Sequence, residues 1–208
     1  MYGSSVPARL PRNAHVVVVL SHPNPDGFGS ASARVAVDAL HAAGHRVTLL
    51  DLYGEGFDPV MSREELHRYQ SRTPDTSGPL KRHIEAVTSA DAIVFVYPTW
   101  WSGLPAVLKG WLERVMLPTV SFDFDGRNKV RPALTNIRRV VVISTYGSPR
   151  RYVAAVNDNG LRILARAFRL TCGLRTRVTR IRLFSMDTSG DAGRQLHLRR
   201  IERRMRAL

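Results

Sequence analysis

The 208-residue sequence contains a single cysteine, Cys172, so no internal disulfide can form. It has no apolar run of about 18 residues, the length that a membrane-spanning helix needs, and we expect no membrane partner. Residues 1–14 contain arginines and prolines but lack the continuous apolar stretch of a secretory signal. We therefore expect a cytoplasmic protein with a flexible N-terminal arm over residues 1–14.

Histidines are also few, and they do not cluster. His41 and His45 are four residues apart, but Gly44 is expected to end the helix before His45. No group of Cys and His residues has the spacing of a zinc site. The sequence therefore predicts no metal.

Acidic residues number 17 against 31 lysines and arginines, which gives a formal net charge of +14. The excess is C-terminal, because residues 138–208 hold 17 arginines and four acids, whereas residues 1–137 are nearly neutral. Such an asymmetry can indicate a nucleic-acid-binding surface or an attraction for dinucleotide phosphates. The arginines are instead dispersed through expected strands and helices, without a DNA-binding motif. We expect a solvated basic surface and no nucleic-acid partner.

Five apolar segments alternate with helical patterns along the chain. The unbroken Val-rich run of residues 15–20 is typical of a strand covered on both faces, and further strands are expected at residues 46–51, 92–96, 138–145 and 177–184. Ser30 or Ser32 can cap a helix that runs to about His41. The alternation predicts one three-layer α/β domain over residues 15–208, with a five-stranded parallel sheet in the order 2-1-3-4-5.

Residues 97–115 hold all three tryptophans and directly follow the third expected strand. The second half of this segment has apolar residues at helical spacing, which places Trp111 in a helix core. Trp100 and Trp101 then lie in a loop at the carboxyl end of a central strand, where open α/β sheets bind ligands. Two indoles beside Gly103 suit a flat aromatic ligand, and the alternative is that both are buried core residues.

The loop after the first strand covers residues 21–30 and contains Gly27 and Gly29. Together with Asp51 at the end of the next strand, it mimics a dinucleotide-binding fingerprint. A true fingerprint has its first glycine at the tight turn directly after the strand, whereas six residues intervene here. We reject that motif and expect a long polar loop that wraps a phosphate at the start of the helix.

Residues 98–115 resemble a run that lines the flavin in the flavodoxin-like NAD(P)H:quinone oxidoreductases, the group of DT-diaphorase and modulator of drug activity. The matching positions are Pro98, Trp101, Gly103, Pro105, Ala106, Leu108, Lys109, Gly110, Trp111, Glu113, Arg114 and Val115. The resemblance extends over about residues 14–205. It implies a flavodoxin-like fold that binds a flavin.

The resemblance also implies three flavin-binding loops. Their residues are His22, Phe28, Gly29 and Ser30 in the first loop, Pro98, Thr99, Trp100, Trp101, Ser102 and Gly103 in the second, and Thr145, Tyr146, Gly147 and Ser148 in the third. Phe122 and Phe124 stand where the family has an aromatic pair that roofs the quinone and nicotinamide site. They are the expected substrate-binding residues.

Tyr152 stands where the family has a tyrosine that approaches the flavin, and we expect it to be catalytic. Six residues later the family has a catalytic histidine, but this chain has Asp158. The usual Tyr–His pair therefore cannot form at these positions. Backbone amides of residues 146–148, with Arg150 or Arg151, are expected to take over part of the charge compensation.

The resemblance implies a flavin-dependent NAD(P)H dehydrogenase, in which NAD(P)H passes hydride to the flavin N5 and leaves before a quinone-like acceptor binds. FAD is the first choice of cofactor and FMN the second. We expect a homodimer with the site at the subunit boundary, because one small domain does not easily hide the aromatic loops from water. The alternative is a flavodoxin-like electron carrier or flavin sensor without substrate turnover, which has no need of Phe122 and Phe124 as a substrate roof.

Overall fold

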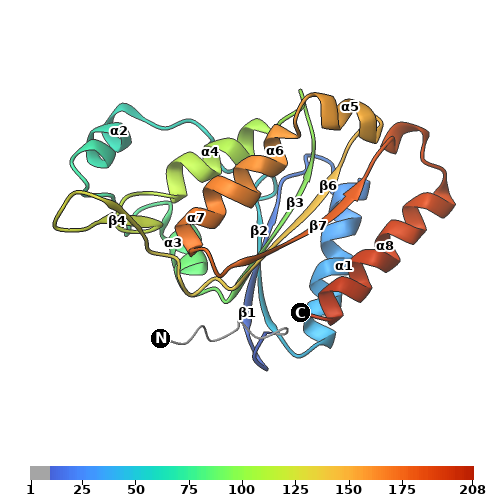
Figure 1. The fold of residues 1–208 in the computed structure, drawn as a ribbon, viewed down its shortest axis with the longest axis horizontal. Coiled ribbons are helices and arrows are strands. Elements are labelled where there is room, and N and C mark those ends of the chain that lie inside the picture. Colours follow the sequence, from blue (N-terminus) through green and yellow to red (C-terminus); the bar gives the residue numbers. More distant parts are fainter. Residues whose placement is uncertain (1–9) are drawn as a thin grey trace.

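The sheet at the centre of the molecule consists of five parallel strands (Figure 1). In the computed structural model, which describes residues 10–208, they are β1 (His15–Leu20), β2 (Arg46–Asp51), β3 (Ala92–Pro98), β6 (Arg139–Thr145) and β7 (Arg177–Leu183). Their order is β2-β1-β3-β6-β7. This is the topology predicted as 2-1-3-4-5, and only the numbering differs, because β4 (Phe122–Phe124) and β5 (Val130–Pro132) form a separate hairpin.

Helices cover both faces of the sheet, which explains why its central strands are apolar on both sides. One face carries α1 (Phe28–Ala42) and α8 (Asp191–Arg206), and the other carries α3 (Lys81–Thr88), α4 (Ala106–Val115) and a helical segment of α6 (Asn159–Arg162), the π-helix η1 (Ile163–Phe168) and α7 (Arg169–Cys172) (Figure 1). Within β1, Val16 and Val18 pack into the core under α1 and α8, whereas Val17 and Val19 pack into the opposite core. The predicted three-layer architecture is confirmed.

The chain enters α1 without the predicted serine cap. Ser30 Oγ donates to the Asn24 carbonyl oxygen at 2.8 Å, and Ser32 Oγ donates to the Phe28 carbonyl oxygen at 2.8 Å. The N-cap is Gly27, which has no side-chain oxygen. The prediction of a serine cap is wrong because the turn ahead of Gly27 starts the helix earlier than either serine. The first N–H groups of α1 are thus left without a side-chain partner.

The chain from Leu10 onward packs against the domain. Residues 1–9 of the expected arm lie outside the described residues, whereas Leu10 and Ala14 are buried and the Leu10 N–H donates to the Leu208 carbonyl oxygen. The segment of residues 10–14 is therefore anchored at Leu10 and Ala14, whereas residues 11–13 are exposed. Within residues 10–208, no helix is both long and apolar enough to cross a bilayer. The same residues bring no three His, Cys, Asp or Glu side chains together as a possible metal site.

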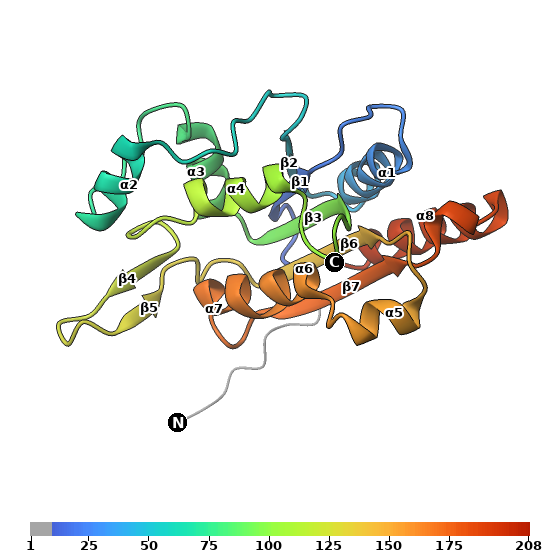
Figure 2. The same ribbon diagram turned by 90° about the horizontal axis from the view of Figure 1, so that it is seen from above.

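The carboxyl ends of β1, β3 and β6 meet at one edge of the sheet, so the loops that follow these strands are neighbours. The last two loops are joined by the Thr99 N–H, which donates to the Thr145 carbonyl oxygen at 2.8 Å. After its loop, α4 carries the chain back to the opposite edge of the sheet, where the β4–β5 hairpin projects from the domain (Figure 2). The predicted ligand-binding loops and the hairpin therefore lie at opposite ends of the strands.

Candidate functional site

Trp100 and Trp101 lie in the loop after β3, as predicted, and neither indole is buried in the core. Trp100 is 43% exposed and Trp101 is fully exposed. Trp101 and Ser102 have positive φ angles of 47° and 56°, and the Gly103 N–H closes the turn by donating to the Trp100 carbonyl oxygen at 2.9 Å. Trp111, by contrast, is fully buried in α4. The alternative that Trp100 and Trp101 are core residues is excluded.

A cavity of about 450 Å³ opens between the loops after β3 and β6. Its lining residues are Thr99, Trp101, Ser102, Tyr146, Gly147, Ser148, Tyr152, Val153, Val156 and Asp158. Most of them were predicted as site residues; Val153 and Val156 were not, because a valine in a helical pattern carries no signal of a site. The volume falls within the range of small-molecule sites, about 300–1,000 Å³.

The loop after β1 reaches the same edge of the sheet but does not line this cavity. Its His22 packs against the start of α1: a Cβ atom at Gly27 would lie 2.3 Å from His22 Cε1, and one at Gly29 would lie 2.5 Å from His22 Cδ2. The two glycines that mimic a nucleotide fingerprint therefore make room for an imidazole ring. Phe28 lies beside His197 of α8, with 5.9 Å between the ring centroids.

Three buried hydroxyl oxygens at this edge have no hydrogen-bond partner among the described residues. Ser21 Oγ follows β1, Tyr97 Oη lies at the carboxyl end of β3, and Thr99 Oγ1 follows β3. A buried polar atom without a partner costs free energy unless a ligand or water pairs with it. The loop that begins at Ser21 leads into the uncapped start of α1, where free N–H groups favour a negatively charged group. These features fit a cofactor that carries phosphate and hydrogen-bonding groups, as a flavin does.

The polar floor of the cavity is a network that the sequence did not predict. The Tyr146 hydroxyl donates to both carboxylate oxygens of Asp158 at 3.0 Å, and the Ser144 hydroxyl donates to Tyr146 Oη at 3.1 Å. Arg182 of β7 donates from Nη1 to Asp158 Oδ2 at 3.3 Å. Among the described residues, the partners of the Asp158 carboxylate are thus Tyr146 and Arg182, and Tyr152 is not one of them.

Burial keeps the tyrosine of this network, Tyr146, protonated. It raises the pKa of Tyr146 to about 12, and the charge of Asp158 acts in the same direction. Burial also raises the pKa of Tyr97 well above its ordinary value. The chain reaches Asp158 through a left-handed turn, with φ angles of 70° at Asn157 and 42° at Asp158, and Asn and Asp tolerate this conformation better than most residues. Tyr146 therefore remains a donor to the carboxylate at neutral pH.

Phe122 and Phe124 are not brought to this cavity within one chain. Both lie on β4, at the opposite edge of the sheet (Figure 2). Their rings are 5.8 Å apart in a T-shaped arrangement, and the Arg72 guanidinium lies 3.7 Å from the Phe124 ring centroid. Arg72 also donates to Asn128 Oδ1 at 2.9 Å. The long segment after α4 is therefore a hairpin tied to the residues after α2, and it does not cover its own cavity.

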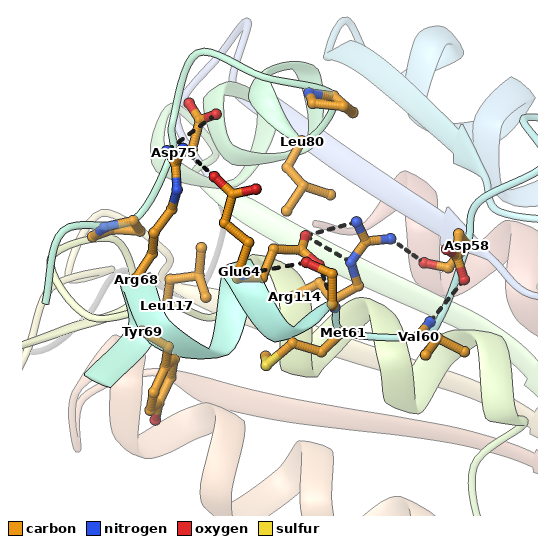
Figure 3. A pocket seen from close by; sticks show the side chains of 14 residues that line it. Asp58, Val60, Met61, Glu64, Arg68, Tyr69, Asp75, Leu80, Arg114 and Leu117 are labelled. Atoms are coloured by element: carbon orange, nitrogen blue, oxygen red, sulfur yellow. Dashed lines mark hydrogen bonds and ion pairs between the residues drawn. The ribbon is translucent and has the colours of Figure 1, made fainter. Parts of the chain in front are cut away.

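A second cavity, of about 320 Å³, lies under α2 (Arg63–Gln70), away from the strand-end loops (Figure 3). Arg114 of α4 closes one side: its Nε and Nη2 donate to Glu65 Oε1 at 3.0 and 2.7 Å, and its Nη1 donates to the Asp58 carbonyl oxygen. Ser62 and Glu65 have the sequence spacing that predicts a capping box, and the structure confirms it, since each side chain bonds the other residue's backbone N–H. No residue of α2 is buried. The Arg114 contacts attach the start of this helix to α4, and Arg72 attaches the chain just after it to the β4–β5 hairpin.

The sequence matches known proteins over most of its length. A family profile described as a flavodoxin-like fold covers residues 14–206. NAD(P)H dehydrogenase (quinone) 1 of Cavia porcellus is 29% identical over 155 residues, which cover 65% of this chain and 54% of that protein. An uncharacterized NAD(P)H oxidoreductase of Haemophilus influenzae is 35% identical over 133 residues, which cover 64% of each. The chain therefore spans less than two thirds of the length of these relatives.

Solved structures have the same architecture. The NAD(P)H:quinone oxidoreductase from Methanothermobacter marburgensis superimposes with a TM-score of 0.76 at 26% identity, over 93% of this chain and 98% of that one. An FMN-dependent NADH-azoreductase from Bacillus anthracis, solved in complex with FMN, superimposes with a TM-score of 0.73 at 14% identity, over 92% of this chain and 97% of that one. The second likeness is one of fold alone. With the profile match over residues 14–206, these findings confirm the resemblance inferred from the tryptophan segment, and the chain belongs to the family with the flavodoxin-like fold.

Proposed function

We propose that this protein is a flavin-dependent NAD(P)H dehydrogenase that reduces a quinone or a similar aromatic acceptor. The cavity beside the fully exposed Trp101 carries this proposal. It lies at the carboxyl edge of a parallel sheet, between the loops after β3 and β6, where folds of this kind bind their ligands. Relatives named as NAD(P)H quinone dehydrogenases or oxidoreductases support the same reaction class.

Different residues at this edge would bind different parts of the flavin. The Ser21 and Thr99 hydroxyls and the uncapped start of α1 lack partners, and they would pair with the polar part of the cofactor. Trp101 and the loop of residues 145–148 would hold its ring system. FAD is our first choice and FMN our second. When bound, a flavin supplies the position that accepts hydride from NAD(P)H and returns it to the acceptor.

The protein itself binds, orients and compensates charge. The backbone of Gly147 and Ser148 lines the cavity, so its amides are placed to stabilise the negative charge that arrives with the hydride. Tyr152 of α5 (Arg150–Ala155) is half-exposed and lines the same cavity. Because Asp158 is engaged by Tyr146 and Arg182, we expect Tyr152 to contribute a single weak hydrogen bond.

We further propose a homodimer with the site at the subunit boundary. Trp101 is fully exposed, and the Phe122 and Phe124 hairpin lies at the far end of its own subunit (Figure 2). If this aromatic pair roofs the substrate, it must come from a second copy of the chain. Light scattering that shows a stable monomer with bound flavin would contradict the dimer.

The proposed function is tested by the visible spectrum of the purified protein, followed by NADH and NADPH oxidation with menadione. We expect a flavin spectrum, restored by FAD after removal of the cofactor, and oxidation that depends on menadione. A protein that binds flavin without oxidising NAD(P)H is the electron carrier or sensor of the alternative. A protein that binds neither flavin nor NAD(P)H contradicts the proposal.

A further inference from the structure

The cavity is lined by one acidic side chain, whereas the protein as a whole has a positive net charge. Of the ten lining residues, Asp158 is the only Asp, Glu, Lys, Arg or His, whereas the whole chain has a formal net charge of +14. The Asp158 side chain is only 13% exposed. A carboxylate so far removed from water is screened less than a surface charge. A ligand in this cavity therefore meets a local negative charge inside a basic protein.

The network described above holds the carboxylate in one orientation. Tyr146 donates to both of its oxygens, and Arg182 donates to Oδ2. Arg182 does not line the cavity. Phe184 ties the two partners together, because it stacks on Tyr146 with 4.9 Å between ring centroids and lies 5.1 Å from the Arg182 guanidinium.

We propose that Asp158 makes this cavity selective for aromatic ligands that carry a positive charge or an N–H donor, with Tyr146 and Arg182 as its positioning residues. With the flavin ring held by Trp101 and residues 145–148 as proposed above, a second, cationic ring that reaches the carboxylate gains an attraction that a neutral ring of the same shape lacks. Arg182 weakens this attraction without cancelling it, because the ligand contacts Asp158 and not the guanidinium. The histidine that the family resemblance implies for this position supplies no negative charge.

Asp158 would also act on the hydride donor in the reductive half of the reaction, a step that rests on the proposed function. A dihydronicotinamide that gives up a hydride loses two electrons and one proton, so its ring becomes a cation. Positive charge therefore develops on the donor ring in the transition state, and a nearby carboxylate stabilises it more than it stabilises the neutral donor. Asp158 is the residue lining the cavity whose carboxylate can stabilise the positive charge on the donor ring.

Calorimetric titration tests the selectivity without turnover. The probes are the cation 1-methylnicotinamide and its neutral analogue nicotinamide, two rings of similar shape. We expect the wild-type protein to bind the cation about tenfold more tightly, and Asp158→Asn to bring the two affinities close to each other. Tyr146→Phe should lower the ratio of the two affinities, because the carboxylate loses a donor that orients it, whereas a general loss of structure lowers both affinities together.

Asp187→Asn is the matched control for net charge. Asp187 approaches the same loop, since a Cβ atom at Gly147 would lie 2.7 Å from its Oδ2, but it does not line the cavity. This variant should keep the wild-type preference. An unchanged preference in Asp158→Asn overturns the proposal, as does an equal loss in Asp187→Asn.

The wild-type protein alone tests the proposal if the variants fail to fold. Equal affinities for the two probes, or tighter binding of nicotinamide, overturn it. These titrations are independent of the proposed function. A protein without quinone reductase activity can still prefer the cation, and an active reductase can lack the preference.

Discussion

The buried imidazole of His197 makes the stability of this protein depend on pH. His197 lies on α8 against Phe28, the first residue of α1, and is 4% exposed. Its Nε2 has no hydrogen-bond partner within residues 10–208. Burial, with a smaller effect of the nearby Arg200 charge, lowers the pKa of His197 from 6.5 to about 4. The folded protein therefore holds this ring neutral, and acid should destabilise the contact between α8 and α1.

The sign and the size of the effect follow from proton linkage. The unfolded chain binds a proton on this histidine at its ordinary pKa of 6.5, whereas the folded chain does so only near 4. Above the unfolded value the group costs no stability, and stability is lost as the pH falls from there toward the folded value. At about pH 5 the loss from this group amounts to about 2 kcal/mol, compared with almost none above neutrality.

Urea unfolding followed by circular dichroism, at about pH 7.5 and about pH 5, measures this loss. In His197→Leu, the drop in the free energy of unfolding between the two pH values should be about 2 kcal/mol smaller than in the wild type. Every other titrating group is common to both proteins. His41→Leu is the matched control, because His41 is exposed at the end of α1, and it should keep the wild-type drop. An undiminished drop in His197→Leu would refute the buried neutral imidazole.

Three further predictions concern single substitutions. Trp101→Ala should release flavin more readily than Trp111→Ala, because Trp101 is exposed beside the cavity and Trp111 is core; flavin fluorescence of the filtrate measures this, and release by a folded Trp111→Ala alone would reverse the assignment. Tyr152→Phe should slow flavin reduction by about tenfold or less in stopped flow, and a loss of about a thousandfold would show another proton partner. Gly110→Ala should lower the free energy of unfolding by about 1–3 kcal/mol, because its Cβ atom would lie 2.2 Å from a backbone oxygen of the segment before α2. Urea unfolding measures this, and Gly126→Ala is the control, because its Cβ atom would have no atom within 4 Å and the free energy of unfolding should stay unchanged.

The parts of the fold that depend on local pattern were predictable from the sequence. An unbroken Val-rich run needs cover on both faces, and β1 has it. The helical stripe around Trp111 and the capping box at Ser62 were equally local signals, and both are confirmed. The start of α1 was missed because a glycine N-cap leaves no polar side chain to recognise, while Ser30 and Ser32 made other bonds.

The site was predictable only in part, because its polar floor depends on tertiary register. Asp158 and Arg182 are 24 residues apart, and they meet only because β7 pairs with β6 in the register that sets Ser144 opposite Arg182. The sequence spacing of Asp158 and Arg182 does not predict that they form an ion pair. The position of Phe122 was equally inaccessible, because the sequence between α4 and β6 gives no sign of which end of the strands its hairpin will occupy.

The attachment of α2 sets the local stability of the whole excursion after β2. A helix of eight residues is too short to persist alone in water, and this one contributes no residue to either core. Its order therefore depends on contacts near its two ends: the guanidinium of Arg114, which is 12% exposed, joins Glu65 to the Asp58 backbone, and Arg72 contacts the β4–β5 hairpin. Loss of the Arg114 side chain would make residues 58–79 open more readily than the sheet, so that amide exchange and proteolytic cleavage would begin there. The same residues line the cavity under α2, so this cavity would exist only while residues 58–79 stay attached to the domain.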